Sequence, residues 1–384
     1  MIYLDNAATG FFKPKTVLEK VAFSLEYLSA NPGRGGHELS LKVASAVHKT
    51  RRTLSEFLEL PCGNIVFTLN CSHALNFAIN GLLAFRQHSH VVCSCYEHNS
   101  VLRPLNTLAK NGQIKLTILP PTLNGGVCPK AIEQSLQKDT RLVITNHVSN
   151  VTGGITPIFE IGKICRKNGV PYLVDAAQSA GHIDIDMTKN NVDMLALAPH
   201  KGLYAPQGIG VLAVRNGIAP LIPQLSGGTG TDSTTLSQPF ELPESHEIGT
   251  LPTPAIAGLL AGLNWTKENL DTINTKTKDL FDLGLTELKK INGVNIYTAK
   301  NNCNSILSFN IGNMHSSEVA EILSNEYSIC VRGGLHCAPL IHEYLGTLGQ
   351  GIVRASIGFN NEIADIEKLI WAVKDIAGKF GGKF

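Results

Sequence analysis

An α/β fold with a mostly parallel sheet, helices on both of its faces and a second, smaller domain is predicted from three features of the sequence. The chain has 384 residues, which is more than one ordinary domain of roughly 100–200 residues. From about residue 64 to residue 214, short β-branched runs alternate with longer amphipathic stretches, as in βαβ units. The texture then changes to Gly, Ser, Thr and Pro at 217–254, before a second set of elements.

The elements follow from the periodicity of the apolar residues. In the first set we expect strands at 64–69, 90–95, 115–119, 141–145, 172–177, 194–198 and 209–214, with helices at 72–86, 99–110 and after Pro157. In the second set we expect a helical stretch from Thr253 to Ile291 broken near Asn269, strands at 305–311, 329–333 and 352–357, a helix at 316–327 and a last helix from Glu362. We therefore expect an N-terminal segment at 1–15 that packs with the small domain, a large domain at 16–250 and a small α+β domain at 251–384.

Composition argues against several classes of protein. Lys and Arg total 33 against 31 for Asp and Glu, and 43% of the residues are hydrophobic, so neither disorder nor a polyanion-binding surface is indicated. The N-terminus lacks signal-peptide features, and no apolar run reaches the ~18 residues of a membrane span. We expect a cytoplasmic protein without a nucleic-acid or membrane partner. The nine scattered cysteines should be reduced, and the pair Cys93 and Cys95 lacks the further ligands that a zinc site needs.

Lys201 is the first candidate functional residue. It follows an apolar strand in LALAPHKG, where the carboxyl end of the strand should open onto a ligand pocket. Burial there lowers the pKa of a lysine and prepares it to form a Schiff base. Considered alone, an exposed loop lysine is the simpler explanation of the position.

Asp175 strengthens that interpretation, because it ends the strand YLVD upstream of Lys201. Pyridoxal 5′-phosphate (PLP) needs a carboxylate on its ring nitrogen, since a protonated ring acts as an electron sink. The alternative role for Asp175 is to cap the next helix. Together, Lys201 and Asp175 favour a PLP site.

Two further strand ends carry residues that suit the same cofactor. Asn70, Cys71 and Ser72 stand where a strand turns into a helix, and a helix N-terminus with a hydroxyl group binds phosphate. Ser72 can equally be an ordinary N-cap, and one turn can fill both roles. His98 follows the next strand and could stack on the cofactor ring, or be a structural histidine.

The motifs, in order, carry a resemblance to a known family. LDNAAT (4–9), NCSHALN (70–76), EHNS (97–100), HVSNVTG (147–153), DAAQ (175–178), HKG (200–202) and VRGGLHCAP (331–339) resemble the class V aminotransferase superfamily. Within it, the sequence is most similar to cysteine desulfurases and selenocysteine lyases. The resemblance spans nearly the whole chain and implies the PLP-dependent transferase fold of type I, with a seven-stranded type of sheet and a smaller C-terminal domain.

The resemblance implies a role for each matching residue. Lys201 would form the Schiff base, Asp175 would hold the ring nitrogen, and His98 would stack on the ring. Gln178 would donate to the phenolic oxygen. Phosphate ligands would be Ser72, His200, the Cys71 backbone amide and, from the neighbouring subunit of a homodimer, Thr250. Asn150 and Arg332 would lie near the substrate, and Arg354 would bind its carboxylate through two parallel hydrogen bonds. A rim salt bridge is the alternative role for Arg354.

Cys337 distinguishes between reactions. In the family, a loop cysteine attacks the sulfur of PLP-bound cysteine, which leaves alanine and a persulfide, and the spacing from Cys337 to Arg354 resembles the group with a compact loop. The alternative is a cysteine that fills space as a small hydrophobe. His336 and the nearby arginines would add positive charge and favour the reactive thiolate.

These observations lead to one expected function and several alternatives. We expect L-cysteine to react through an external aldimine, with Lys201 as base, Cys337 as sulfur acceptor and a further sulfur-acceptor protein, in sulfur mobilisation such as iron–sulfur cluster assembly. Alternatives are a selenocysteine lyase, another class V lyase, epimerase or aminotransferase, and a sulfur-trafficking scaffold without turnover. Ala198 stands where a phosphate-binding hydroxyl is common, so one phosphate contact should be missing. The sequence does not determine the preference between sulfur and selenium, the acceptor, or the order of the loop at 226–238.

Overall fold

The computed structural model describes residues 1–33, 35–60, 64–84, 88–218, 220–231 and 234–380, and it contains three sheets. The large sheet has seven strands, which confirms the predicted α/β architecture. In spatial order they are β2 (Ile65–Thr68), β8 (Gly210–Val214), β7 (Met194–Leu197), β6 (Tyr172–Asp175), β5 (Thr140–Asn146), β3 (Ser89–Ser94) and β4 (Ile114–Leu119). Only β8 runs antiparallel to its neighbours, so the other six strands point their carboxyl ends to one edge.

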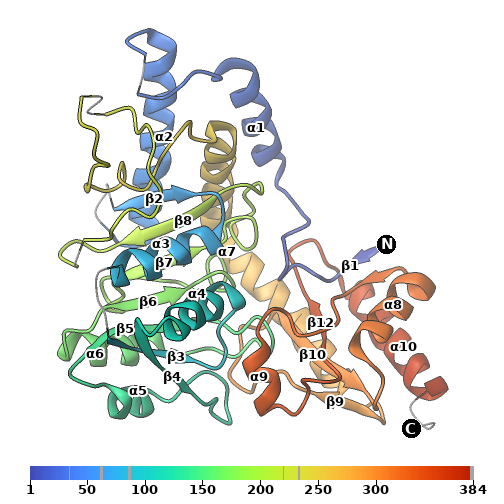
Figure 1. Cartoon of the computed structure of the whole chain (residues 1–384). Helices are drawn as coiled ribbons and strands as arrows, with labels where there is room; N and C mark the ends of the chain where they lie inside the picture. The colour runs from blue at the N-terminus through green and yellow to red at the C-terminus, as the bar shows by residue number, and fades with distance from the viewer. Residues whose placement is uncertain (34, 61–63, 85–87, 219, 232–233, 381–384) are drawn as a thin grey trace.

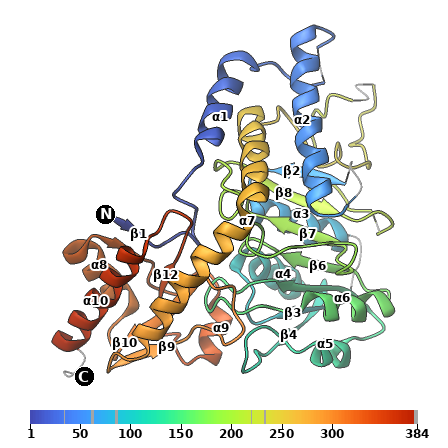
Figure 2. The same cartoon turned by 180° about the vertical axis from the view of Figure 1, so that it is seen from behind.

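Helices cover both faces of this sheet, as the alternating pattern predicts (Figures 1 and 2). One face packs against α3 (Cys71–Leu83) and α4 (Asn99–Lys110). The other face packs against α2 (Glu38–Phe57), α5 (Pro129–Ser135), α6 (Ile158–Lys167) and the first half of α7 (Thr253–Leu288). Successive strand residues point to opposite faces of the sheet: Leu173 packs on the side of α3 and α4, and Val174 packs on the side of α2, α5, α6 and α7. The predicted helix at 72–86 ends earlier, and residues 85–87 lie outside the described part of the chain.

The C-terminal part has its own sheet and its own core. β10 (Ile306–Ile311) pairs antiparallel with β9 (Val294–Ile296) and β12 (Val353–Ser356). The helices α8 (Ser316–Tyr327) and α10 (Ile363–Phe380) pack on it, and the short α9 (Pro339–Tyr344) follows the Cys337 loop. β11 (Ile329–Cys330) pairs in parallel with β1 (Ile2–Tyr3), so the N-terminal strand joins this domain. Figure 1 shows the blue N-terminal trace rising from β1 to α1 (Lys15–Tyr27) beside the large sheet.

Two predicted elements differ in the structure. α7 is a single helix of 36 residues, so the predicted break near Asn269 is wrong. The Asn269 side chain donates to the Trp265 carbonyl one turn earlier at 2.8 Å, which lets a residue typical of helix ends remain inside a helix. The strand expected at 329–333 has only two residues, because the chain beyond Cys330 bends to form an isolated bridge between Arg332 and Arg354.

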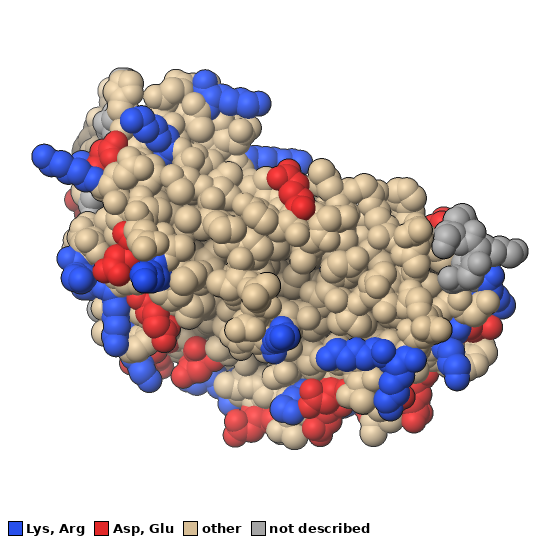
Figure 3. All heavy atoms as spheres, turned by 90° about the horizontal axis from the view of Figure 1, so that it is seen from below, with Lys and Arg blue, Asp and Glu red and all other residues tan. Residues whose placement is uncertain are grey.

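The long segment at 217–252 forms neither helix nor strand in its described residues, as its composition predicts; residues 219, 232 and 233 lie outside them. Within the described ranges, no helix is both long enough and apolar enough to span a membrane. Figure 3 shows that Lys, Arg, Asp and Glu lie mainly along the rim of one face, with few of them near its centre. All the described cysteines are free thiols, and Cys62 falls outside the described residues.

Candidate active site

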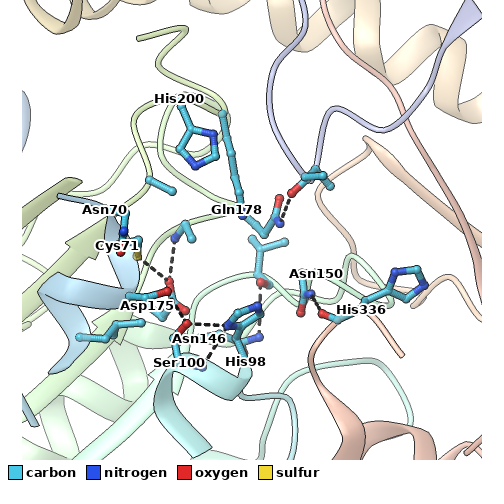
Figure 4. Close-up of a pocket in the computed structure, with 18 of the residues that line it drawn as sticks. Asn70, Cys71, His98, Ser100, Asn146, Asn150, Asp175, Gln178, His200 and His336 are labelled. Atoms are coloured by element: carbon cyan, nitrogen blue, oxygen red, sulfur yellow. Dashed lines mark hydrogen bonds between the residues drawn. The ribbon is translucent and has the colours of Figure 1, made fainter. Parts of the chain in front are cut away.

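A cavity of about 210 Å³ lies at the carboxyl ends of the parallel strands, where such sheets bind ligands. It contains most of the residues singled out from the sequence (Figure 4). Its walls include Asn70, Cys71, Ser72, His98, Asn150, Asp175, Gln178, Ala198, His200, Lys201, Arg332 and Arg354. Large-domain strand ends, the N-terminal segment and the small domain all contribute to one cavity.

Lys201 and Asp175 form the floor of this cavity. Lys201 lies in the turn after β7, where its amide donates to the Ala198 carbonyl at 3.0 Å. Burial lowers the pKa of Lys201, and the nearby Asp175 opposes that shift. Asp175 is the last residue of β6, and its Oδ1 accepts from the Ala177 amide at 2.9 Å. The arrangement offers an amine poised to lose its proton beside a buried carboxylate.

Cys71 contributes a side chain that the sequence did not predict to matter. Its Sγ lies 3.7 Å from Asp175 Oδ1, and burial raises the pKa of this thiol well above its usual value (Figure 4). The thiol therefore stays protonated and donates a weak hydrogen bond to Asp175. The Cys71 thiol and the Ala177 amide both donate to Oδ1, and no hydrogen bond from another described residue reaches Oδ2, so Oδ2 can accept from a ligand.

His98 and Ser100 shape the next strand end. His98 caps α4: its Nδ1 accepts from the Ser100 amide at 3.0 Å, which leaves the proton of the neutral ring on Nε2. Burial lowers the pKa of His98 and favours that neutral form. The Ser100 hydroxyl lies 2.8 Å from His98 Nδ1 and 2.6 Å from the Ser72 hydroxyl. The ring is thus fixed by its own helix and linked to the start of α3.

The other end of the cavity suits an anion. Ser72 lies in the first turn of α3, whose N-cap is Asn70; the Asn70 side chain accepts from the His73 amide at 2.9 Å. His200 Nδ1 lies 2.9 Å from the Thr9 hydroxyl, and burial, with help from Lys201, lowers the pKa of His200 to about 4. His200 is therefore a neutral ring. Ala198 lines the same wall and has no hydroxyl to offer, as its place in the sequence predicts.

Gln178 and Asn150 are held by single hydrogen bonds and keep donors or acceptors free. The side-chain amide of Gln178 donates to the Ala7 carbonyl at 2.9 Å, and the side-chain amide of Asn150 donates to the His336 carbonyl at 2.6 Å (Figure 4). Both partners lie in other parts of the chain. These two bonds tie the large domain to the N-terminal segment and to the small domain.

Two arginines of the small domain close the cavity. Arg354 is only 1% exposed, and its guanidinium donates to Asp5 at 2.7 Å and to the Asn150 carbonyl at 3.0 Å. Burial lowers the pKa of Arg354, and Asp5 opposes that shift. Arg332 pairs with Arg354 through backbone hydrogen bonds of 2.8 and 3.1 Å. Two cations therefore face one cavity, and Asp5 forms an ion pair with Arg354.

Cys337 lies next to this cavity and does not line it. It lines a neighbouring hollow of about 600 Å³, which shares Ser72, His98 and Ser100 with the cavity. Its Sγ is 3.7 Å from Arg332 Nη2. His336 and Cys337 have left-handed backbones, with φ of +50° and +58°, which is unusual for residues other than glycine and typical of functional loops. The loop thus presents a half-buried thiol beside a cation.

Two expectations about this region need correction or qualification. The sequence predicts that His336 adds positive charge, but burial lowers its pKa to about 2, and its Nε2 bonds the Ile352 carbonyl at 2.8 Å. The ring is neutral, so the charge near the thiol comes from Arg332. Thr250 is exposed and outside the cavity, with its hydroxyl 3.5 Å from the Asn31 amide nitrogen. This chain alone does not bring Thr250 to the site.

Sequence reasoning missed several contributors. Ala7 and Ala8 line the cavity, and Asp5 is the partner of Arg354. The motif LDNAAT was the available signal, but nothing in its local pattern indicates contact with residues some 350 positions away. Glu97 was also missed: it is fully buried, and its Oε1 accepts from the Asn146 amide at 2.8 Å and from the Ser94 hydroxyl. Burial raises the pKa of Glu97 to about 8.

Comparison with known proteins places the chain among proteins of one family. The family model described as aminotransferase class-V matches residues 2–369. A probable cysteine desulfurase of Methanothermobacter thermautotrophicus is 34% identical, with 98% of this chain and 95% of that protein covered. A cysteine desulfurase of Shigella flexneri is 28% identical, with 98% and 93% covered.

The similarity extends to solved structures. The apo structure of a cysteine desulfurase from Thermococcus onnurineus NA1 superposes with a TM-score of 0.92 at 33% identity. The alignment covers 99% of this chain and 95% of that one. The similarity therefore includes the large sheet, the small domain and the segment that joins them.

Proposed function

The chain belongs to the class V aminotransferase family, and from that premise we propose that it is a PLP-dependent cysteine desulfurase, which converts L-cysteine to L-alanine and takes the sulfur on Cys337. One observation carries the proposal: a lysine and a carboxylate share one cavity with two arginines, and a thiol lines the hollow beside that cavity. The two relatives and the Thermococcus structure carry the same enzyme name.

The donor set of the cavity fits PLP. Lys201 would supply the amine for a covalent link, Asp175 would hold the ring nitrogen with its carboxylate, and His98 would stack on the ring. Ser72, the Cys71 backbone amide and His200 Nε2 would hold the phosphate, and the remaining side-chain N–H of Gln178 would donate to the phenolic oxygen. When bound, PLP supplies an electron sink that stabilises negative charge at the substrate α-carbon.

The remaining residues bind the substrate and move protons. Arg354 and Arg332 offer guanidinium groups to the α-carboxylate, and Asn150 lies beside them. The lowered pKa of Lys201 suits the amine that removes the α-proton and later returns one. Burial lowers the pKa of His98 and of His200, so both rings are weaker bases for that proton than ordinary histidines.

Sulfur transfer requires a nucleophile. The Cys337 thiolate attacks the substrate sulfur, an S–S bond forms, and the carbon–sulfur bond breaks with its electron pair remaining on the carbon side. Protonation then gives alanine, and Cys337 carries the persulfide. Arg332, at 3.7 Å, is the cation positioned to stabilise the thiolate. A thiol or an acceptor protein must then remove the extra sulfur, and iron–sulfur cluster assembly in the cytoplasm is the use we propose.

A homodimer completes the proposal. The exposed Thr250 is suited to reach the phosphate of a partner subunit, since it is unused in its own site. Large exposed apolar side chains also occur on the N-terminal segment, α1, α2 and the long loop, as expected for a covered surface: Phe11, Leu18, Phe23, Leu25, Tyr27, Leu41, Leu236 and Phe240. We retain the division into an N-terminal segment at 1–15, a large domain at 16–250 and a small domain at 251–384.

The decisive test compares Cys337→Ala with Cys128→Ala, which removes an exposed thiol that lines neither the cavity nor the neighbouring hollow. With L-cysteine and a reductant, alanine and sulfide are measured separately. We expect Cys337→Ala to bind L-cysteine and form almost no alanine, and Cys128→Ala to match the wild type. Full alanine formation by Cys337→Ala would replace the proposal with a lyase that needs no cysteine nucleophile.

A further inference from the structure

The N-terminal segment connects the small domain to the floor of the cavity. Leu4 is fully buried in the small-domain core, and its amide donates to the Cys330 carbonyl at 2.8 Å. Six residues later, the Gly10 amide donates to the His200 carbonyl at 3.1 Å. A side chain at Gly10 would press against the Lys201 carbonyl, since a Cβ there would lie 3.0 Å from it. The segment between these anchors is therefore fixed across the site.

Asp5 lies between these two anchors and meets Arg354. Its Oδ1 accepts from Arg354 Nη2 at 2.7 Å, and the two side chains are 21% and 1% exposed. Arg354 Nη1 donates to a backbone carbonyl, that of Asn150. Arg354 Nε is buried and has no partner among the described residues. The Arg354 guanidinium therefore keeps N–H donors that could bind a ligand while the Asp5 carboxylate balances its charge.

We propose that Asp5 is a positioning residue that serves as the counter-ion of Arg354 in the empty site and then shares that arginine with the α-carboxylate of the substrate or product. The proposal rests on the assignment of Arg354 to the substrate carboxylate. Its consequence is that Asp5 weakens the binding of carboxylates, because it occupies one donor of the Arg354 guanidinium and offsets part of the charge of that arginine. L-Alanine can therefore leave after each turnover.

The electrostatics give the effect a sign. Without the Asp5 charge, Arg354 is an uncompensated buried cation next to Arg332, which costs stability. An incoming carboxylate then supplies the missing counter-charge and recovers that cost. Loss of the Asp5 charge should thus destabilise the free protein and tighten carboxylate binding. A residue that merely braced the fold would lower both stability and affinity.

The test is isothermal titration of L-alanine into the PLP-loaded protein and its Asp5→Asn variant. Asparagine keeps the oxygen that accepts from Arg354 and removes only the charge. We expect Kd for L-alanine to fall by roughly fivefold to tenfold, the order expected for one partly screened charge pair. The melting temperature of the ligand-free variant should fall, and L-alanine should raise it more than in the wild type. An unchanged or higher Kd would overturn the proposal.

Two controls separate this inference from the proposed function. Asp193→Asn weakens another ion pair, with Arg215 at the opposite edge of the sheet, and should lower stability without changing Kd. Arg354→Gln should weaken L-alanine binding and abolish the gain from Asp5→Asn in the double variant. If Arg354→Gln leaves L-alanine binding unchanged, the carboxylate assignment fails and the Asp5 role fails with it. If Arg354→Gln weakens binding but Asp5→Asn does not tighten it, only the Asp5 role is overturned.

Discussion

The floor and the outer wall of the cavity are built in different ways. Asp175 on the floor ends β6, and Lys201 follows the adjacent parallel strand β7. The backbone hydrogen bonds that hold them involve residues nearby in sequence, Ala177 and Ala198, and the Cys71 thiol at the start of α3 adds a weak bond to Asp175. Arg354 on the wall depends instead on Asp5, at the other end of the chain. The floor is therefore fixed by the sheet itself, whereas the wall depends on how the small domain and the N-terminal segment meet the large domain.

The largest expected effect is on the floor. In the proposed mechanism, Lys201→Ala removes both the covalent link and the base, so activity with L-cysteine should fall by at least ~10³-fold, given what general base catalysis contributes. Borohydride reduction should attach the cofactor to the wild-type protein and not to the variant. Peptide mapping checks the position, and a reduced cofactor found on another lysine would contradict the assignment.

A smaller effect is expected on the wall. Arg354→Lys keeps the charge but loses the two-pronged donor geometry, so transition-state stabilisation should drop by ~2–3 kcal/mol, as for hydrogen bonds to charged groups. Steady-state kinetics with L-cysteine measures this as a fall in kcat/KM. Kinetics equal to those of the wild type would remove Arg354 from the substrate site.

A third effect concerns the buried Glu97, which bonds the Asn146 amide near the floor of the cavity and should make stability depend on pH. Its pKa is raised to about 8 in the folded protein, from an ordinary value of 4.5. Between these pH values the native state keeps a proton that the unfolded state has lost. Stability should therefore fall as pH rises from 4.5 to 8, by up to about 1.4 kcal/mol per pH unit. Denaturant unfolding at several pH values measures how the free energy of unfolding changes with pH, and Glu97→Gln should reduce that dependence. An equal pH dependence in the wild type and the variant would mean that another group titrates.

The smallest effect concerns the partner subunit. If Thr250 bonds the neighbour's phosphate, Thr250→Ala should weaken PLP binding by ~1 kcal/mol, or roughly fivefold. Mixing it with excess Lys201→Ala subunits creates hybrid dimers in which an intact Lys201 faces an intact Thr250. PLP affinity and activity, calculated per Thr250→Ala subunit, should then be higher than in the unmixed Thr250→Ala protein. No recovery on mixing, or full activity of a sedimenting monomer, would contradict this arrangement.

The same division explains what could be predicted from the sequence. Strand ends are readable from local pattern, so the sequence alone was enough to place Asp175, Lys201 and His98 together. The neutral state of His336 could not be predicted, because it depends on burial against Ile352 and on neighbouring arginines. The contact of Asp5 with Arg354 could not be predicted either, since a pairing between opposite ends of the chain leaves no local signal. The continuous α7 shows a third limit: a polar residue inside a helix can be satisfied by its own backbone.

The central claim is that Cys337, outside the cavity that holds Lys201, receives the sulfur. Mass spectrometry of peptides after a brief incubation with less than stoichiometric L-cysteine tests it most directly. The account predicts an added mass of one sulfur on the peptide that contains Cys337, removable by a reductant and absent from the peptide that contains Cys71. Sulfur on another cysteine, or on none while alanine still forms, would contradict it.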